Sequence, residues 1–310
     1  MDKFRSMANV DGLITDAADA KIPLMDRGFL YGDSIYEVFR TYKGIPLFHD
    51  EHWARFENSA QLAHLGLTIS KDRMLDEIRR TVKATNAADL NRDVYVRYII
   101  TRGEGPIDLF PRPELTTRFV ILVKELPEWK QEYSSVGIRL AIPEIRRNAT
   151  NALDPNIKGG NYLNNILGMI EARALGADDC VMLNNSGLIT EASTSNVFFI
   201  KQNENILITP AKAAGHLRCL TKAAVEKICL ENNLELRAED ISVAALENTT
   251  ECFLTSSTKE VMPVSSLRLP DGNVLSYPKG GGDMTRQLIQ HYIAFVDAHI
   301  KTHEHLCLYK

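Results

Sequence analysis

Alternating apolar and polar residues predict strands in the first third of the chain. The segments SIYEVFRTY (34–42), DVYVRYIITRG (93–103) and TRFVILVKEL (117–126) have this strand character. After the first of them, Lys43-Gly44 is a hairpin signal. Apolar residues at helical spacing predict two helices, near residues 53–65 and 74–82.

The second half of the chain interleaves predicted strands with predicted helices, as a mixed α/β fold requires. The strands are expected at 138–142, 180–183, 188–191 and 196–201, and the helices near 161–175, 220–232 and 284–300.

The segment LPEWKQEYSSVG (126–137) places proline, serine and charged residues between two strand-like runs. It is therefore the predicted interdomain connection. We expect a small N-terminal α/β domain at 1–125 and a large C-terminal α/β domain at 138–310.

Composition narrows the class of protein. The 310 residues are 45% hydrophobic and 25% charged with a formal net charge of −4, which is typical of a globular protein and gives no basic field for nucleic acid. No segment approaches the roughly 18 apolar residues of a membrane span, and the N-terminus lacks an apolar leader core, so we expect a cytoplasmic protein without membrane contact. Five cysteines without a C-x-x-C pair predict reduced thiols, and we predict no metal site.

Lys158 is the residue with the most chemical promise. In DPNIKGGNYLNNILGMIEAR, an extended segment ending in a single lysine meets the start of an amphipathic helix. A lysine that forms a Schiff base needs a rigid mount and nearby polar partners. Gly159 and Gly160 allow close backbone approach, and Tyr162 brings a phenol. Further on, Glu191 lies among small and hydroxyl residues, where a buried carboxylate would need a partner such as a protonated pyridine nitrogen.

These pieces recur in a familiar order: DRGFLYGD at 26–33, EHWARF at 51–56, Lys158, and TEASTSNVF at 190–198. The chain resembles the class IV aminotransferases, which are fold-type IV enzymes dependent on pyridoxal 5′-phosphate. The resemblance runs from about residue 11 to about residue 292 and implies a two-domain α/β fold with the Schiff-base lysine in the second domain.

The resemblance also implies a role for individual residues. Lys158 would be the catalytic lysine and hold the cofactor, Arg55 would bind its phosphate, Tyr162 its phenolic oxygen, and Glu191 its pyridine nitrogen. The remaining implied cofactor contacts are Thr194, Ser195, Asn196, Leu220, Thr221 and Ser257. Cys219 and Ser256 stand where family members commonly have glycine, which leaves the geometry of the phosphate-binding turns open.

An enzyme of this kind would run two half-reactions with ping-pong kinetics, passing an amino group from an amino acid or amine to a keto acid. The family resemblance further implies a homodimer in which a loop of the partner subunit closes the pocket. Residues 102–113 are the expected closing loop.

The substrate is less clearly encoded. Period-two alternation puts Tyr36, Val38 and Arg40 on one face of their strand, and Tyr95 with Arg97 on one face of theirs. We expect the two sets to wall one pocket together. The Tyr95-x-Arg97 pair and Arg40 resemble branched-chain aminotransferases, whereas Val38 resembles the D-amino acid subgroup. We therefore favour branched-chain L-amino acids, with a D-amino acid or (R)-selective amine transaminase as the alternative and an aminodeoxychorismate lyase third. The expected substrate contacts are Tyr31, Tyr36, Val38, Arg40, Tyr95, Arg97, Ser257 and Thr258.

Overall fold

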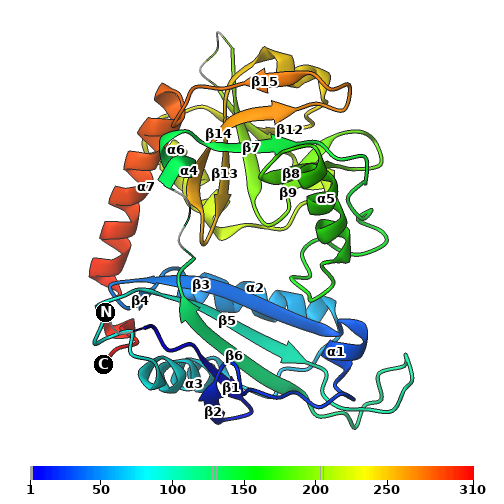
Figure 1. Cartoon of the computed structure of the whole chain (residues 1–310), viewed down its shortest axis with the longest axis vertical. Coiled ribbons are helices and arrows are strands. Elements are labelled where there is room, and N and C mark those ends of the chain that lie inside the picture. Colours follow the sequence, from blue (N-terminus) through cyan, green and yellow to red (C-terminus); the bar gives the residue numbers. More distant parts are fainter. Residues whose placement is uncertain (1–2, 128, 130, 203, 205) are drawn as a thin grey trace. The chain divides into compact units, whose positions relative to one another are not determined.

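The computed structural model describes residues 3–127, 129, 131–202, 204 and 206–310 (Figure 1). These residues form two compact units. Unit 1 comprises Met1–Pro127, Ile157–Asn161 and Asp297–Lys310, and unit 2 comprises Glu128–Asn156 and Tyr162–Val296. Two segments beyond the expected connection, Ile157–Asn161 and Asp297–Lys310, thus belong with the N-terminal residues.

Unit 1 is built on a six-stranded antiparallel sheet with the order β2-β1-β6-β5-β3-β4. Its strands are β1 (Met7–Val10), β2 (Leu13–Asp16), β3 (Ser34–Tyr42), β4 (Ile45–Pro46), β5 (Val94–Thr101) and β6 (Arg118–Glu125). The turn between β3 and β4 uses Lys43 at φ 53° and Gly44 at φ 77°, the left-handed pair that a two-residue hairpin requires. The predicted hairpin is therefore confirmed.

Three helices accompany this sheet: α1 (Arg27–Tyr31), α2 (His49–Leu62) and α3 (Lys71–Ala84). Helix α2 packs on β3, and α3 packs on β1 and β6. Helix α3 begins at Ser70, whose hydroxyl accepts a hydrogen bond from the Arg73 N–H at 3.3 Å. Apolar side chains of the helices meet those of the strands in one core that includes Phe39, Phe56 and Tyr98.

Unit 2 contains a nine-stranded mixed sheet. Eight strands follow the order β12-β11-β10-β13-β14-β7-β8-β9, and the ninth strand, β15, pairs with β14. The strands are β7 (Ile138–Ala141), β8 (Asp179–Leu183), β9 (Ile189–Ala192), β10 (Asn196–Lys201), β11 (Leu207–Pro210), β12 (Leu236–Glu239), β13 (Thr249–Ser256), β14 (Glu260–Arg268) and β15 (Val274–Ser276). The α-helices are α4 (Gln131–Ser135), α5 (Leu163–Ala174), α6 (Leu220–Glu231) and α7 (Asp283–Thr302). The 3-10 helices are η1 (Lys212–Ala214), η2 (Ala244–Asn248) and η3 (Glu304–Leu306). The C-terminal end of α7 and the whole of η3 belong to unit 1. The predicted mixed α/β fold is confirmed.

In the part of the chain that is described, no helix is both long and apolar enough to span a bilayer. Within the same residues, no group of three or more His, Cys, Asp or Glu side chains is arranged to hold a metal ion.

Candidate functional site

Lys158 lies in an extended segment that hydrogen-bonds to the edge of β3. Its carbonyl accepts from the Tyr36 N–H at 2.9 Å, and its own N–H donates to the Ser59 hydroxyl on α2 at 3.1 Å. The next two residues are glycines because the backbone comes close to β3 here: a Cβ at Gly160 would lie 2.5 Å from the Ser34 hydroxyl. The main chain that carries the lysine is therefore held on both sides.

The Lys158 amine, Tyr36 and Arg97 form one group. The amine lies 4.6 Å from the centroid of the Tyr36 ring, and the Arg97 guanidinium lies 3.7 Å from the same centroid. Cations near the electron-rich face of an aromatic ring are attracted to it. Tyr36 is buried, so it provides a fixed surface for both cations.

The β3–β5 register places the predicted substrate residues on one face. Val38 pairs with Arg97, and Arg40 pairs with Tyr95. Directly opposite residues of an antiparallel pair project to the same side, so these four side chains share the face of Tyr36. The register therefore brings the two sets of side chains onto one face, and their role in substrate binding stays a prediction. Of the other predicted substrate residues of unit 1, Tyr31 ends the short helix α1, where the Arg27 guanidinium lies 5.0 Å from its ring centroid.

Arg55 binds Glu37, which points to the opposite face of β3 from its neighbours Tyr36 and Val38. The Arg55 Nε and Nη2 atoms donate to the two carboxylate oxygens of Glu37, each at 2.7 Å, and His52 Nδ1 lies 2.6 Å from Glu37 Oε2. Burial by itself would raise the pKa of Glu37, but the charges and hydrogen bonds of Arg55 and His52 hold that pKa far below its ordinary value. Burial lowers the pKa of His52, more than the neighbouring carboxylate raises it.

Sequence reasoning did not find Glu37 and His52 as partners of Arg55. The available signal was their position in the quoted motifs. Glu37 directly follows Tyr36 in SIYEVFRTY, and His52 lies three residues before Arg55 in EHWARF.

In unit 2, Glu191 is buried at the centre of a set of donors. Its Oε1 accepts from Nε and Nη2 of Arg147, both at 3.1 Å. Its Oε2 accepts from the Asn196 amide and from the Leu217 N–H, both at 3.2 Å. Hydrogen bonds and a cation directed at a carboxylate favour its ionised form. Arg147, which the sequence analysis did not single out, thus belongs to the candidate site, and the only hint was a pair of arginines shortly after a buried strand.

The predicted phosphate-binding turns lie close to Glu191. The Cys219 thiol contacts the Thr255 carbonyl at 3.7 Å, and Thr255 pairs with Asn196 across β13 and β10. Helix α6 begins after Cys219 without a side-chain cap, so its N-terminal amides can face an anion. Leu220 and Thr221 form the first turn of this helix.

Several buried polar atoms around these turns have no hydrogen-bond partner among the described residues. They are Thr221 Oγ1, Thr255 Oγ1 and Asn196 Oδ1. Buried polar groups are normally paired, so three such atoms beside an uncapped helix start indicate a place for a polar ligand. This part of unit 2 therefore fits a phosphorylated cofactor.

The remaining predicted residues of unit 2 lie in turns or at a helix start. Thr194 and Ser195 connect β9 to β10, Ser257 and Thr258 connect β13 to β14, and Tyr162 precedes α5. Cys219 has a φ of −86°, and Ser256 is not among the described residues with positive φ. Neither position therefore needs the left-handed backbone that would favour the glycine seen in many family members.

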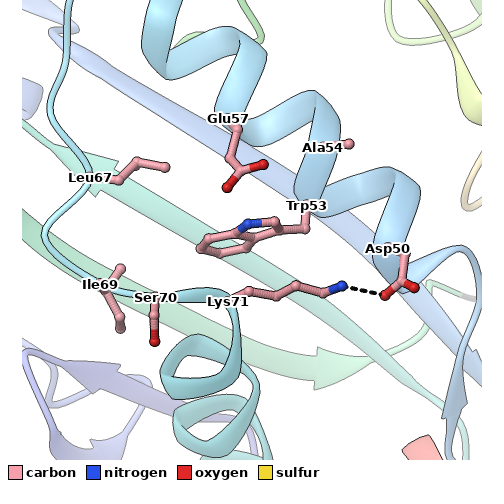
Figure 2. A pocket seen from close by; sticks show the side chains of 8 residues that line it. All are labelled: Asp50, Trp53, Ala54, Glu57, Leu67, Ile69, Ser70 and Lys71. Atoms are coloured by element: carbon pink, nitrogen blue, oxygen red, sulfur yellow. Dashed lines mark ion pairs between the residues drawn. The ribbon is translucent and has the colours of Figure 1, made fainter.

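Unit 1 also has a groove of about 570 Å³ between α2 and the start of α3. Figure 2 shows the Trp53 indole in this groove between Glu57 and Lys71, and the Lys71 ammonium pairs with Asp50 at 2.6 Å. Its lining contains none of the residues predicted from the sequence for the active site. The lining residues are Asp50, Trp53, Ala54, Glu57, Leu67, Ile69, Ser70 and Lys71.

Comparisons with known proteins find similarity over most of the chain. The family model for amino-transferase class IV matches residues 34–267. A Methanocaldococcus jannaschii protein named as a branched-chain-amino-acid aminotransferase is 31% identical over 280 residues, which cover 90% of this chain and 92% of that protein. The D-alanine aminotransferase of Staphylococcus epidermidis is 27% identical over 294 residues, which cover 94% of this chain and 98% of that protein. The crystal structure of the Escherichia coli branched-chain amino acid aminotransferase superposes with a TM-score of 0.85 at 25% identity and covers 94% of each chain.

Proposed function

The chain belongs to the class IV aminotransferases, and from that membership we propose that it moves an amino group between branched-chain L-amino acids and 2-oxoglutarate or another keto acid. Enzymes of this class are transaminases that use pyridoxal 5′-phosphate, so this is the cofactor of the chain. The choice of substrate and the role of each residue are the parts that we propose.

The observation that carries the substrate assignment is the shared face of β3 and β5. Arg97 and Arg40 bring two cations to the side of the sheet where the Lys158 amine meets Tyr36. A keto acid or amino acid carries a carboxylate, which a guanidinium binds well. Tyr36, Val38 and Tyr95 supply apolar and aromatic surface beside these cations, as a branched aliphatic side chain requires.

The proposed mechanism assigns one task to each group. When bound, pyridoxal 5′-phosphate supplies an electron-accepting ring that stabilises negative charge at the substrate Cα. Lys158 would hold the cofactor and would move the proton at the substrate Cα. Glu191, which accepts hydrogen bonds from Arg147 and Asn196, would pair with the ring nitrogen of the cofactor.

Other residues bind and orient. In unit 2, the first turn of α6 with the Thr221 hydroxyl and the Ser257 turn would bind phosphate, and Tyr162 would bind the phenolic oxygen. In unit 1, the family resemblance assigns phosphate binding to Arg55. Thr194, Ser195 and Asn196 order the turn that follows Glu191. The substrate contacts that we propose in unit 1 are Tyr31 and the shared face of β3 and β5, and those that we propose in unit 2 are Ser257 and Thr258.

A donor panel tests the assignment. The purified, cofactor-loaded enzyme would be mixed with 2-oxoglutarate and one amino donor, and the keto acid or ketone product measured by mass spectrometry. We expect L-leucine and L-valine to react at least tenfold faster than D-alanine, D-glutamate or (R)-1-phenylethylamine, and Lys158→Ala to be inactive with all of them. Faster turnover of the D-amino acids or the (R)-amine would overturn the substrate proposal and leave the transaminase.

That outcome would favour the second candidate, a D-amino acid or (R)-selective amine transaminase. Two observations support it: Val38 narrows the substrate face directly opposite Arg97, and the Staphylococcus epidermidis relative is a D-alanine aminotransferase. The same panel decides between the two functions.

We also propose that the enzyme is a homodimer. Large apolar side chains are exposed on unit 1 in two nearby segments, with Leu24 and Phe29 near α1 and Ile107, Leu109 and Phe110 in the loop after β5. Arg27 joins the segments, since its guanidinium donates to the carbonyls of residues 108 and 109. Such apolar surface favours coverage by another protein surface. Light scattering after gel filtration should give twice the mass of 34.8 kDa, and a monomer at micromolar concentration would refute the dimer.

The cytoplasm is the compartment that we propose for this enzyme. All five cysteines are free thiols in the structure, and thiols stay reduced in the cytosol. Cell fractionation would test this, and recovery of the protein outside the cytosol would contradict it.

A further inference from the structure

A buried ion pair in unit 2 lies between two turns of the candidate site. The Lys259 ammonium donates to Asp179 Oδ2 at 2.7 Å, and the two side chains are only 10% and 6% exposed. Asp179 starts β8, whereas Lys259 lies in the turn between β13 and β14. None of the roles assigned above uses either residue.

On one side, the pair holds the turn between β9 and β10. The Lys259 ammonium also lies within hydrogen-bond distance of the Ser195 hydroxyl at 3.2 Å and of the Thr194 hydroxyl at 3.4 Å. Asp179 Oδ1 accepts from the Ser193 N–H at 3.3 Å. An ammonium has three N–H donors, and here three acceptors surround it, which fixes its direction.

On the other side, the pair holds the turn that carries Ser257 and Thr258. The Lys259 N–H donates to the Ser256 hydroxyl at 3.1 Å, and the Trp129 indole N–H donates to the Thr258 carbonyl at 2.9 Å. The Lys259 ammonium lies 5.7 Å from the centroid of the Trp129 ring. The turn is thus tied down at its beginning, its centre and its end.

We propose that Lys259 is a positioning residue, which through Asp179 and the hydroxyls of Thr194 and Ser195 fixes the Ser257–Thr258 turn where it receives the substrate carboxylate. This inference rests on the proposed function, because it takes Ser257 and Thr258 as substrate contacts. Surface lysines are usually mobile and dispensable, but this side chain is only 10% exposed, has all its donors used, and joins two turns that are 60 residues or more apart in sequence.

The test removes the pair without leaving a lone buried charge. The double variant Asp179→Asn/Lys259→Met takes away both charges, while the amide introduced at position 179 keeps an oxygen for the Ser193 N–H. The matched control is Lys201→Met/Glu239→Gln, which removes a more exposed 2.9 Å ion pair between β10 and β12 of the same unit. Measurements are KM and kcat for L-leucine and 2-oxoglutarate, the dissociation constant of pyridoxal 5′-phosphate from titration of the apoenzyme, and the melting temperature.

For the Lys259 double variant we expect KM for both substrates to rise about tenfold while kcat at saturation changes less than about threefold. The dissociation constant of the cofactor and the melting temperature should stay near those of the control variant. A KM within twofold of the wild type in this variant would overturn the inference. If neither the wild type nor the control variant turned over any amino donor, the proposed function would fall instead.

A second variant covers the case in which the double variant does not fold. Lys259→Arg keeps the charge, but a planar guanidinium cannot repeat the three-way contact of a compact ammonium. It should fold and raise KM about threefold. An unchanged KM in folded Lys259→Arg would overturn the inference as well.

Discussion

Arg55 donates two hydrogen bonds of 2.7 Å to the Glu37 carboxylate, which is completely buried in unit 1. A pair of this geometry between strand β3 and helix α2 orients the guanidinium rigidly. The residue proposed to bind phosphate is therefore held in place by a carboxylate on its own unit.

Replacement of that carboxylate should be costly. In Glu37→Gln the Arg55 charge stays buried without its counter-ion, and we expect the free energy of unfolding to fall by about 3–5 kcal/mol. The control is Asp50→Asn, which removes the exposed pair with Lys71 and should cost about 0–1 kcal/mol. Urea unfolding followed by circular dichroism measures both. Equal losses in the two variants would contradict the role of the buried pair.

The same carboxylate should make stability depend on pH. The pKa of Glu37 in the folded protein lies far below its ordinary value of 4.5, because Arg55 and His52 outweigh the effect of burial. A lowered pKa means that the stabilisation is fully present above pH 4.5 and is lost progressively as the pH falls below it. The difference in unfolding free energy between wild type and Glu37→Gln should therefore be constant from pH 8 to 6 and shrink below 4.5. A difference that grew on acidification would show that the sign is wrong.

Much of the fold follows from local pattern. Strand β10 begins and ends where its apolar run predicted, because a buried strand needs only a continuous set of apolar residues between polar ends. Helix α2, in contrast, begins four residues before the predicted start at residue 53. Its first turn follows Phe48 in a left-handed conformation at φ 57° and lacks the Ser, Thr, Asp or Asn that usually marks a helix start.

In the candidate site, too, local sequence patterns predicted some features, whereas contacts between distant segments were not predicted. The common face of Tyr36, Val38 and Arg40 followed from the period of a strand, and the β3–β5 register confirmed it. The partners Arg147 of Glu191 and Asp179 of Lys259 lie 44 and 80 residues away in sequence, so no local pattern could reveal them. Nor could a local pattern show that Lys158 docks on the edge of β3, since that contact depends on pairing between distant segments.

Arg147 offers a test of the Glu191 environment. Arg147→Met removes the guanidinium contacts that orient the Glu191 carboxylate, so that the carboxylate would be placed less precisely against the ring nitrogen. We expect kcat for L-leucine to fall at least tenfold. The neighbouring Arg146 is exposed, so Arg146→Met is the control and should stay within twofold of the wild type. If both variants behaved alike, Arg147 would have no special link to Glu191.

Val38 should set the width of the substrate face. It lies directly opposite Arg97, and Val38→Gly removes a branched side chain from the surface that we propose receives the substrate side chain. One methylene group in an apolar pocket is worth about 1–3 kcal/mol in discrimination. We therefore expect the ratio of kcat/KM for L-leucine over L-alanine to change at least tenfold, with Val38→Ala in between. Because Val38 is only partly buried, Val38→Ala should leave the melting temperature nearly unchanged, which separates a change of the pocket from a change of the fold. Glycine inside a strand costs roughly 0.5–1 kcal/mol more than alanine, so Val38→Gly should melt slightly lower. An unaltered ratio in a stable Val38→Gly variant would place the substrate side chain elsewhere and remove the structural argument for the D-amino acid alternative as well.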